Sequence, residues 1–204
     1  DRLGGHDPYS ASKAATELVV ASWRSAFLYG SKIRLATARA GNVIGGGDWS
    51  QDRILPDLAR ACRDNQILQI RNRYAVRPWQ HVLDPLNGYL LLAEALASNN
   101  SEKFESSFNF GPEPKDCRNV GELVEAALSY WPGDWSDVTE LGAPHEAQNL
   151  SLSIDKARNL LNWSPRWSFD EAVAATVLWY RNVEAGADPS MLVRQQISDF
   201  GFSE

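Results

Sequence analysis

Residues 33–49 read IRLATARAGNVIGGGDW, a stretch of strand composition that runs directly into a segment with repeated glycines. Glycine allows the backbone to turn sharply or to come close to a ligand. A helix is predicted upstream over residues 8–29, because Asp7-Pro8 is typical of an N-cap followed by a first-turn proline, and Gly30 suits a C-cap. Helix, strand and glycine-rich turn in this order predict an α/β fold with ligands beyond the strand ends.

The rest of the chain carries further helix and strand signals. We predict helices over residues 54–64, 84–96, 120–131, 154–161 and 169–183, and strands over 68–71, 77–82 and 108–110. Ser168 and Glu171 predict a capping box at the start of the last helix. The region before residue 154, rich in Gly, Pro and Trp, is predicted to be irregular. Large aromatic side chains dominate buried area, so a core role is expected for Trp131, Trp135, Trp163, Trp167 and Trp179.

Composition and charge exclude several classes of protein. The 204-residue chain has a formal net charge of -6 and dispersed Arg and Lys residues, so a nucleic acid is a poor partner. No apolar run reaches the length that spans a bilayer, and we expect no membrane insertion. Cys62 and Cys117 lack metal-ligand spacing, which predicts no metal site and reduced thiols in a cytoplasmic protein. The chain opens without a signal peptide or initiator Met, and we expect it to be a fragment.

Tyr9 and Lys13 are the first candidates for catalysis. They stand four residues apart at the start of the predicted helix over residues 8–29, and therefore share one face of it. An ammonium group close to a phenol favours the phenolate, which suits the phenol to acid/base chemistry. Such pairs are also commonplace on helices without a catalytic role, so the pair alone leaves both interpretations open.

Arg71, Arg73 and Arg77 are a second group of candidates, placed around two short predicted strands. Three neighbouring guanidinium groups repel one another, so they either lie solvated on a surface or face an anion. The segment that follows Arg77 adds a rigid turn, an aromatic ring and an imidazole, which favours a pocket. His81 is predicted to be a hydrogen-bonded structural residue, and His145 leaves both roles open.

Several segments, taken in order, resemble the extended short-chain dehydrogenase/reductases that act on nucleotide sugars, within the NAD-dependent epimerase/dehydratase family. These segments are YSASK at 9–13, RAGNVIG at 39–45, DRILP at 52–56 and RPWQHV at 77–82. Other segments are similar to the branch that acts on CDP-glucose: GGGDW at 45–49, IRNRY at 70–74, NFGP at 109–112 and PHEA at 144–147. Their conjunction over nearly the whole chain is far more specific than any single motif.

The resemblance implies an enzyme: a lyase that converts CDP-glucose to CDP-4-keto-6-deoxyglucose, with NAD as cofactor. In such dehydratases a tyrosinate removes the 4-hydroxyl proton while NAD takes hydride from C4. Water then leaves across C5 and C6, and the hydride returns to C6. By position, Tyr9 is implied as the base. Tyr9, Lys13 and the backbone of Gly41 are implied to bind the cofactor.

The same resemblance implies the residues that bind the substrate. Asn42 and Arg77 are expected to bind its diphosphate, with Arg71 as a weaker candidate. His145 stands in a loop where many relatives carry an arginine, and it is expected to contact the substrate of the CDP-glucose branch. Arginine suits this role because its guanidinium group binds phosphate oxygens in a bidentate manner.

The resemblance also implies the organisation of the protein. Residues 1–49 are expected to be the remnant of a NAD-binding Rossmann domain with a parallel sheet. Residues 50–204 are expected to form mainly a smaller mixed α/β substrate-binding domain, with some segments returning to the Rossmann domain. A cytoplasmic homodimer is expected, joined through the helix over residues 8–29. Its expected role is deoxysugar biosynthesis for cell-surface glycans such as lipopolysaccharide.

The sequence departs from the family pattern in two respects. It contains neither the G-x-G-x-x-G fingerprint of NAD binding nor the Thr and acid/base pair that assist the tyrosine, so the chain alone is expected to be inactive. Two alternatives stay open. One is another nucleotide-sugar epimerase or reductase of the family, and the other is a catalytically inert module for substrate binding or dimerisation.

Overall fold

A computed structural model describes residues 4, 7–139 and 149–201, and its chain forms two compact units. The first unit contains Asp1–Arg39, Asn87–Asn109 and Ile154–Ser164. The second contains Ala40–Leu86, Phe110–Ser153 and Pro165–Glu204. Each unit is therefore built from segments that are far apart in the sequence.

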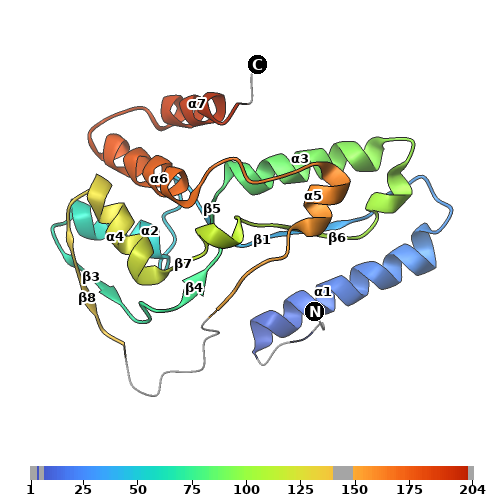
Figure 1. The fold of residues 1–204 in the computed structure, drawn as a ribbon, viewed down its shortest axis with the longest axis horizontal. Helices are drawn as coiled ribbons and strands as arrows, with labels where there is room; N and C mark the ends of the chain where they lie inside the picture. The colour runs from blue at the N-terminus through green and yellow to red at the C-terminus, as the bar shows by residue number, and fades with distance from the viewer. Residues whose placement is uncertain (1–3, 5–6, 140–148, 202–204) are drawn as a thin grey trace. The chain divides into compact units, whose positions relative to one another are not determined.

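The first unit holds a long helix, α1, and the strand pair β1 and β6 (Figure 1). Its elements are α1 (Pro8–Trp23), a π-helical turn (Arg24–Leu28), β1 (Thr37–Ala40), most of α3 (Leu83–Ala97), a 3-10 turn (Ser101–Phe104), β6 (Ser107–Phe110) and α5 (Asp155–Leu161). The helix predicted over residues 8–29 is confirmed, although its last turn is π-helical. Gly30 follows with φ +71°, as a C-cap glycine does.

Helix α1 begins where the sequence predicts. The side chain of Asp7 accepts a hydrogen bond from the backbone N–H of Ser10 at 2.9 Å, and Pro8 occupies the first turn. The hydroxyl group of Ser10 also donates to the side chain of Asp7. This hydroxyl bond, and next the backbone bond, hold the pKa of Asp7 below its ordinary value. None of the α1 residues is buried. One side of the helix, which includes Ala14, Glu17 and Ala21, is partly buried.

The second unit contains three strand pairs and four helices among its described residues (Figure 1). The strands are β2 (Asn42–Ile44), β3 (Ile67–Ile70), β4 (Val76–Arg77), β5 (Trp79–His81), β7 (Arg118–Asn119) and β8 (Asp134–Asp137). The helices are α2 (Ile54–Arg63), α4 (Val120–Tyr130), α6 (Phe169–Glu184) and α7 (Pro189–Asp199), with a 3-10 turn at Pro114–Asp116. β2 and β5 are parallel, as are β3 and β8, whereas β4 and β7 are antiparallel.

The core of the second unit lies between α2, α4 and α6. These helices bury Leu55, Leu58, Leu123, Val124, Val173 and Val177. The predicted capping box at the start of α6 is confirmed, because the side chain of Ser168 accepts from Glu171 N and that of Glu171 from Ser168 N. Trp163 in the first unit and Trp179 in the second are buried, whereas Trp131, Trp135 and Trp167 are partly buried.

The glycine-rich loop after β2 packs against α6. A Cβ atom at Gly46 would lie 2.1 Å from Cδ2 of Trp179, so only glycine leaves room for this indole ring. The hydroxyl group of Tyr180 donates to the backbone carbonyl of Asp48 at 2.5 Å, and burial raises the pKa of Tyr180 to about 12. Gly46 thus serves close packing within the protein, while Gly47, with φ +91°, makes the turn.

The described helices and thiols bear on two other kinds of site, a membrane span and a metal centre. In residues 4, 7–139 and 149–201, no helix combines the length and apolar character needed to cross a bilayer. Cys62 is buried and Cys117 partly buried, and both are free thiols. Within the same ranges, no three His, Cys, Asp or Glu side chains are grouped as metal ligands.

Candidate active site

Tyr9 and Lys13 lie in the first turns of α1, in the first unit. The Nζ atom of Lys13 lies 5.5 Å from the centre of the Tyr9 ring, within the range of a cation–π contact. Tyr9 is 70% exposed, so its hydroxyl group is open to a ligand. The helix therefore brings the predicted phenol and ammonium together on one accessible face.

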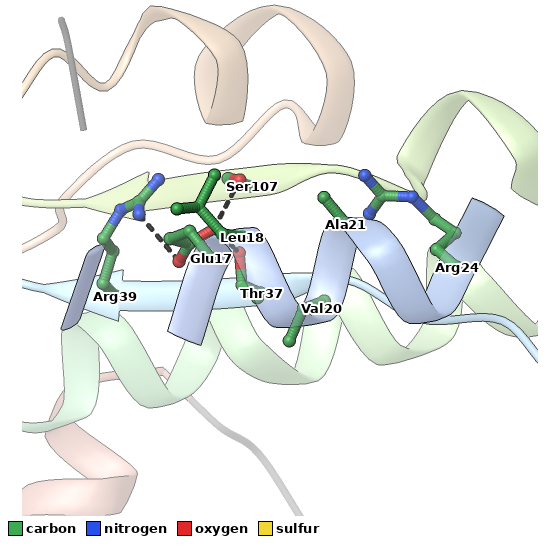
Figure 2. A pocket seen from close by; sticks show the side chains of 8 residues that line it. All are labelled: Glu17, Leu18, Val20, Ala21, Arg24, Thr37, Arg39 and Ser107. Carbon is green, nitrogen blue, oxygen red and sulfur yellow. Dashed lines mark hydrogen bonds and ion pairs between the residues drawn. The ribbon is translucent and has the colours of Figure 1, made fainter. Parts of the chain in front are cut away.

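One turn further along α1, Glu17 joins the helix to both strands of the first unit (Figure 2). Its Oε2 atom accepts hydrogen bonds from the hydroxyl groups of Thr37 and Ser107, both at 2.8 Å. Its Oε1 atom lies 2.8 Å from Nη1 of Arg39, and Nε of Arg39 donates to Oδ1 of Asn109 at 2.7 Å. Sequence reasoning missed Glu17, although its spacing from Tyr9 and Lys13 places it on the same side of the helix.

A pocket of about 150 Å³ lies over this polar cluster. Apolar side chains from α1 and polar side chains from both strands line it together: Glu17, Leu18, Val20, Ala21, Arg24, Thr37, Arg39 and Ser107 (Figure 2). None of the site residues predicted from the sequence is among them. The pocket therefore belongs to the joint between α1 and the strands.

Gly41 and Asn42 belong to the second unit, at the start of β2. The backbone N–H of Asn42 donates to the carbonyl of Pro78 at 3.0 Å, and Asn42 is in register with Trp79 of β5. A Cβ atom at Gly41 would lie 2.7 Å from the same Pro78 carbonyl oxygen. Glycine at 41 is therefore required for the close approach of two strands. This contact places Asn42 beside the segment that carries Arg77.

The three predicted arginines do not form one cluster. Arg77, on β4, is only 8% exposed, and its Nη1 atom donates to the carbonyl of Val76 at 2.9 Å. The side chain of Arg71 is 83% exposed and lies 3.3 Å from that of Asp52. The guanidinium group of Arg73 lies 4.9 Å from the centre of the Trp135 ring. Of the three arginines, only Arg77 is buried, and it directly precedes Pro78, to which Asn42 is hydrogen-bonded. His145, the remaining predicted substrate residue, lies outside the described residues.

His81 is a structural residue, as its sequence context predicts. It is 1% exposed, its ring lies 4.5 Å from that of Trp167, and its Nδ1 atom accepts from the N–H of Leu83 at 3.4 Å. Burial lowers the pKa of His81 to about 4. Three positions later, Asp84 is fully buried and accepts from the N–H of Arg166 at 2.7 Å. Burial raises the pKa of Asp84 to about 6, against the opposing effect of that hydrogen bond.

These two groups predict opposite dependences of stability on pH. Because its folded pKa is lowered, His81 makes the free energy of unfolding fall as pH falls from 6.5 to about 4. Because the pKa of Asp84 is raised in the folded state, Asp84 makes the free energy of unfolding rise as pH falls from about 6 to 3.8. His81→Phe keeps a ring against Trp167 and removes only the first effect. We expect the variant to gain about 3 kcal/mol over the unmodified chain between pH 6.5 and 4.

Urea unfolding at pH 4, 5, 6 and 7 measures this difference. All other titrating groups are common to both proteins and cancel when the two curves are subtracted. Parallel curves for His81→Phe and the unmodified chain would contradict the assignment of His81 as a neutral buried imidazole.

Comparison with known proteins identifies the family. The model of the NAD-dependent epimerase/dehydratase family matches residues 2–111. The chain is 41% identical over 204 residues to CDP-glucose 4,6-dehydratase of Salmonella typhimurium, covering 97% of this chain and 56% of that protein. It is 26% identical over 184 residues to dTDP-glucose 4,6-dehydratase of Streptomyces niveus, covering 89% and 51%. The chain thus spans little more than half the length of these relatives.

Solved structures show the fold. The chain matches dTDP-glucose 4,6-dehydratase from Bacillus anthracis in complex with NAD with a TM-score of 0.70, 18% identity and coverage of 92% and 56% of the two chains. It matches UDP-glucose-4-epimerase from Stenotrophomonas maltophila with bound NAD with a TM-score of 0.73, 18% identity and coverage of 90% and 57%. The expected Rossmann-type α/β fold class is confirmed. The family model matches more than half of the chain, and the chain therefore belongs to the NAD-dependent epimerase/dehydratase family.

Proposed function

We propose that the full-length protein is a nucleotide-sugar 4,6-dehydratase that converts CDP-glucose to CDP-4-keto-6-deoxyglucose and uses NAD as its cofactor. One observation carries the proposal: an exposed tyrosine with a lysine ammonium group 5.5 Å from its ring, in a chain 41% identical to a CDP-glucose 4,6-dehydratase. Another epimerase or reductase of the same family is the principal alternative.

In this proposal Tyr9 acts as the acid/base residue. Its phenolate takes the proton of the sugar's 4-hydroxyl group, with the Nζ atom of Lys13 5.5 Å from the centre of the ring. The exposed Tyr9 and Lys13 side chains also fit the cofactor, because the ammonium group can donate hydrogen bonds to the hydroxyl groups of a nicotinamide ribose and the phenolate oxygen can accept one from them. When bound, NAD supplies the reversible acceptance of hydride. The backbone at Gly41 is proposed to lie near the nicotinamide.

Asn42 and Arg77 are proposed to bind the substrate's diphosphate. A buried guanidinium group interacts strongly with an anion because little water competes with it, and Arg77 is 8% exposed. Arg71 stays a weaker candidate, because its exposed side chain already lies beside that of Asp52. His145 remains a proposed substrate residue on the strength of its sequence position alone.

The proposal extends to organisation. Residues 1–49 are assigned to a NAD-binding Rossmann domain and residues 50–204 mainly to a substrate-binding domain. The make-up of the first unit supports the proposal that later segments return to the Rossmann domain, because it joins Asn87–Asn109 and Ile154–Ser164 to Asp1–Arg39. A cytoplasmic homodimer formed through α1 is supported by Leu18, Val19 and Trp23, which are all more than half exposed. Deoxysugar supply for cell-surface glycans, including lipopolysaccharide, is the proposed role.

The full-length protein, incubated with CDP-glucose and NAD, tests the reaction. We expect a product that has lost one water molecule and shows the alkali-induced absorbance of a 4-keto sugar. The 204-residue chain is the negative control, since it lacks the fingerprint of NAD binding. An isomeric product with its 6-hydroxyl group in place favours the epimerase instead. Binding of CDP in calorimetry without any turnover favours an inert binding module.

A further inference from the structure

We propose that Glu17 is a positioning residue of the active site. It would set the rotation of helix α1, and thereby the orientation of Tyr9 and Lys13, by holding the helix to strands β1 and β6. This inference rests on the proposed function of the Tyr9–Lys13 pair. The physical basis of the inference is that the carboxylate of Glu17 accepts hydrogen bonds from both strands.

The polar partners of Glu17 are arranged by the period of the strands. Thr37 and Arg39 are two residues apart on β1, and Ser107 and Asn109 are two residues apart on β6. Residues two apart in a strand point to the same face, so both pairs present polar groups on the face toward α1. Each strand thus gives Glu17 one hydroxyl hydrogen bond, while Arg39 adds an ion pair and also reaches Asn109.

Such an arrangement defines one rotation of the helix. Directed hydrogen bonds weaken steeply when their angles change, so three polar contacts to one carboxylate favour a single orientation of the helix. Helix α1 buries none of its side chains, and the Glu17 side chain is only 14% exposed. Besides Glu17, Arg24 donates to the carbonyl of Leu35, at a long 3.4 Å. Glu17 therefore makes the shorter of the described side-chain contacts that join this helical segment to the strands and the residues before them.

The effect of Glu17 on the candidate site is geometric rather than electrostatic. Tyr9, Lys13 and Glu17 follow one another at intervals of four residues along one side of α1. Eight residues of helix separate Tyr9 from Glu17 by about 12 Å, which exceeds the Debye length at moderate salt. The charge of Glu17 is also balanced by Arg39 at 2.8 Å. Its removal therefore acts on Tyr9 through the rotation of the helix.

Glu17→Gln in the full-length protein tests this role, with Glu105→Gln as the matched control. Glu105 lies in the same unit, forms an ion pair with Arg34 at 3.5 Å and has a similarly covered side chain, 19% against 14% exposed. Misplacement of a reacting group by about 1 Å costs up to about 100-fold in rate. We expect Glu17→Gln to lower kcat by about 10- to 100-fold with KM for CDP-glucose unchanged, and Glu105→Gln to leave both unchanged.

Hydrogen exchange supplies a readout that does not depend on turnover. Amides of residues 9–23 are expected to exchange at least about tenfold faster in Glu17→Gln than in Glu105→Gln, because α1 opens locally more often. If Glu17→Gln does not fold, Ser107→Ala removes one hydroxyl donor and should produce a smaller change of the same kind. Unchanged exchange in α1 overturns the inference. If the unmodified enzyme fails to turn over CDP-glucose, the proposed function is wrong. Faster exchange confined to α1 in Glu17→Gln would then still support the role of Glu17 in holding α1 to the strands.

Discussion

Replacing Tyr9 by Phe in the full-length protein is expected to lower kcat for dehydration of CDP-glucose by about 10²- to 10⁴-fold. The substitution removes only the hydroxyl oxygen that takes the proton of the sugar. The ring remains, and so does its contact with the ammonium group of Lys13, 5.5 Å from the ring centre. Because substrate binding is assigned to Asn42 and Arg77, KM should change little, and the loss should appear in kcat.

Tyr29→Phe is the matched control for this experiment. Tyr29 is 92% exposed, lies in the same unit and follows the π-helical turn, so the same atom is removed away from the candidate site. Its kcat should equal that of the unmodified enzyme. Steady-state rates of 4-keto sugar formation, together with single-turnover rates, separate a loss of chemistry from a loss of binding. A Tyr9→Phe enzyme with undiminished kcat would rule out Tyr9 as the base.

The parts of the site that sequence predicts are those whose partners are local. Tyr9 and Lys13 are four residues apart on a helix whose start is encoded by Asp7 and Pro8, so their proximity follows from helical geometry. Glu17 was missed because its partners are distant. Thr37 and Ser107 lie 20 and 90 positions away, and no local pattern indicates that both strands meet α1.

The distinction between local and distant partners also explains most of the errors in the predicted secondary structure and site. The segment of β8 is predicted to be irregular because its region is rich in Gly, Pro and Trp, yet Asp134–Asp137 pair in parallel with β3. Such pairing with a distant strand overrides propensity. The arginines at 71, 73 and 77 were grouped by sequence distance, but the β4 strand buries only Arg77. α7 was not predicted at all, although Asp188 and Pro189 form a recognisable helix start.

The glycines of residues 41–47 show what the sequence does not predict. They predict a turn or a close approach of the backbone, but not which group is approached. At Gly41 the neighbour is the carbonyl oxygen of Pro78, and at Gly46 it is the indole ring of Trp179. Both neighbours belong to the second unit of the chain itself. Packing within this unit therefore accounts for the absence of a side chain at both positions.

Gly46→Ala is accordingly expected to lower the free energy of unfolding by about 3 kcal/mol, at the upper end of the range for overpacked cores. The backbone at Gly46 is not in the left-handed region, so alanine causes no conformational strain there. The penalty comes from the added Cβ atom, which would lie 2.1 and 2.2 Å from two atoms of the Trp179 ring. That ring is 6% exposed and belongs to α6, so it must shift within a packed environment.

Gly47→Ala is the matched control, because its Cβ atom would lie 3.7 Å from the same ring, an ordinary contact distance. Its φ of +91° makes alanine unfavourable by only about 1 to 2 kcal/mol. Combining each substitution with Trp179→Leu separates the causes, since the smaller side chain relieves the collision at residue 46 and leaves the backbone strain at residue 47. Urea unfolding of the five variants, Trp179→Leu alone included, and of the unmodified chain should therefore show strong coupling for Gly46 and almost none for Gly47. Equal losses from Gly46→Ala with and without the indole ring would contradict this account of the glycine-rich loop.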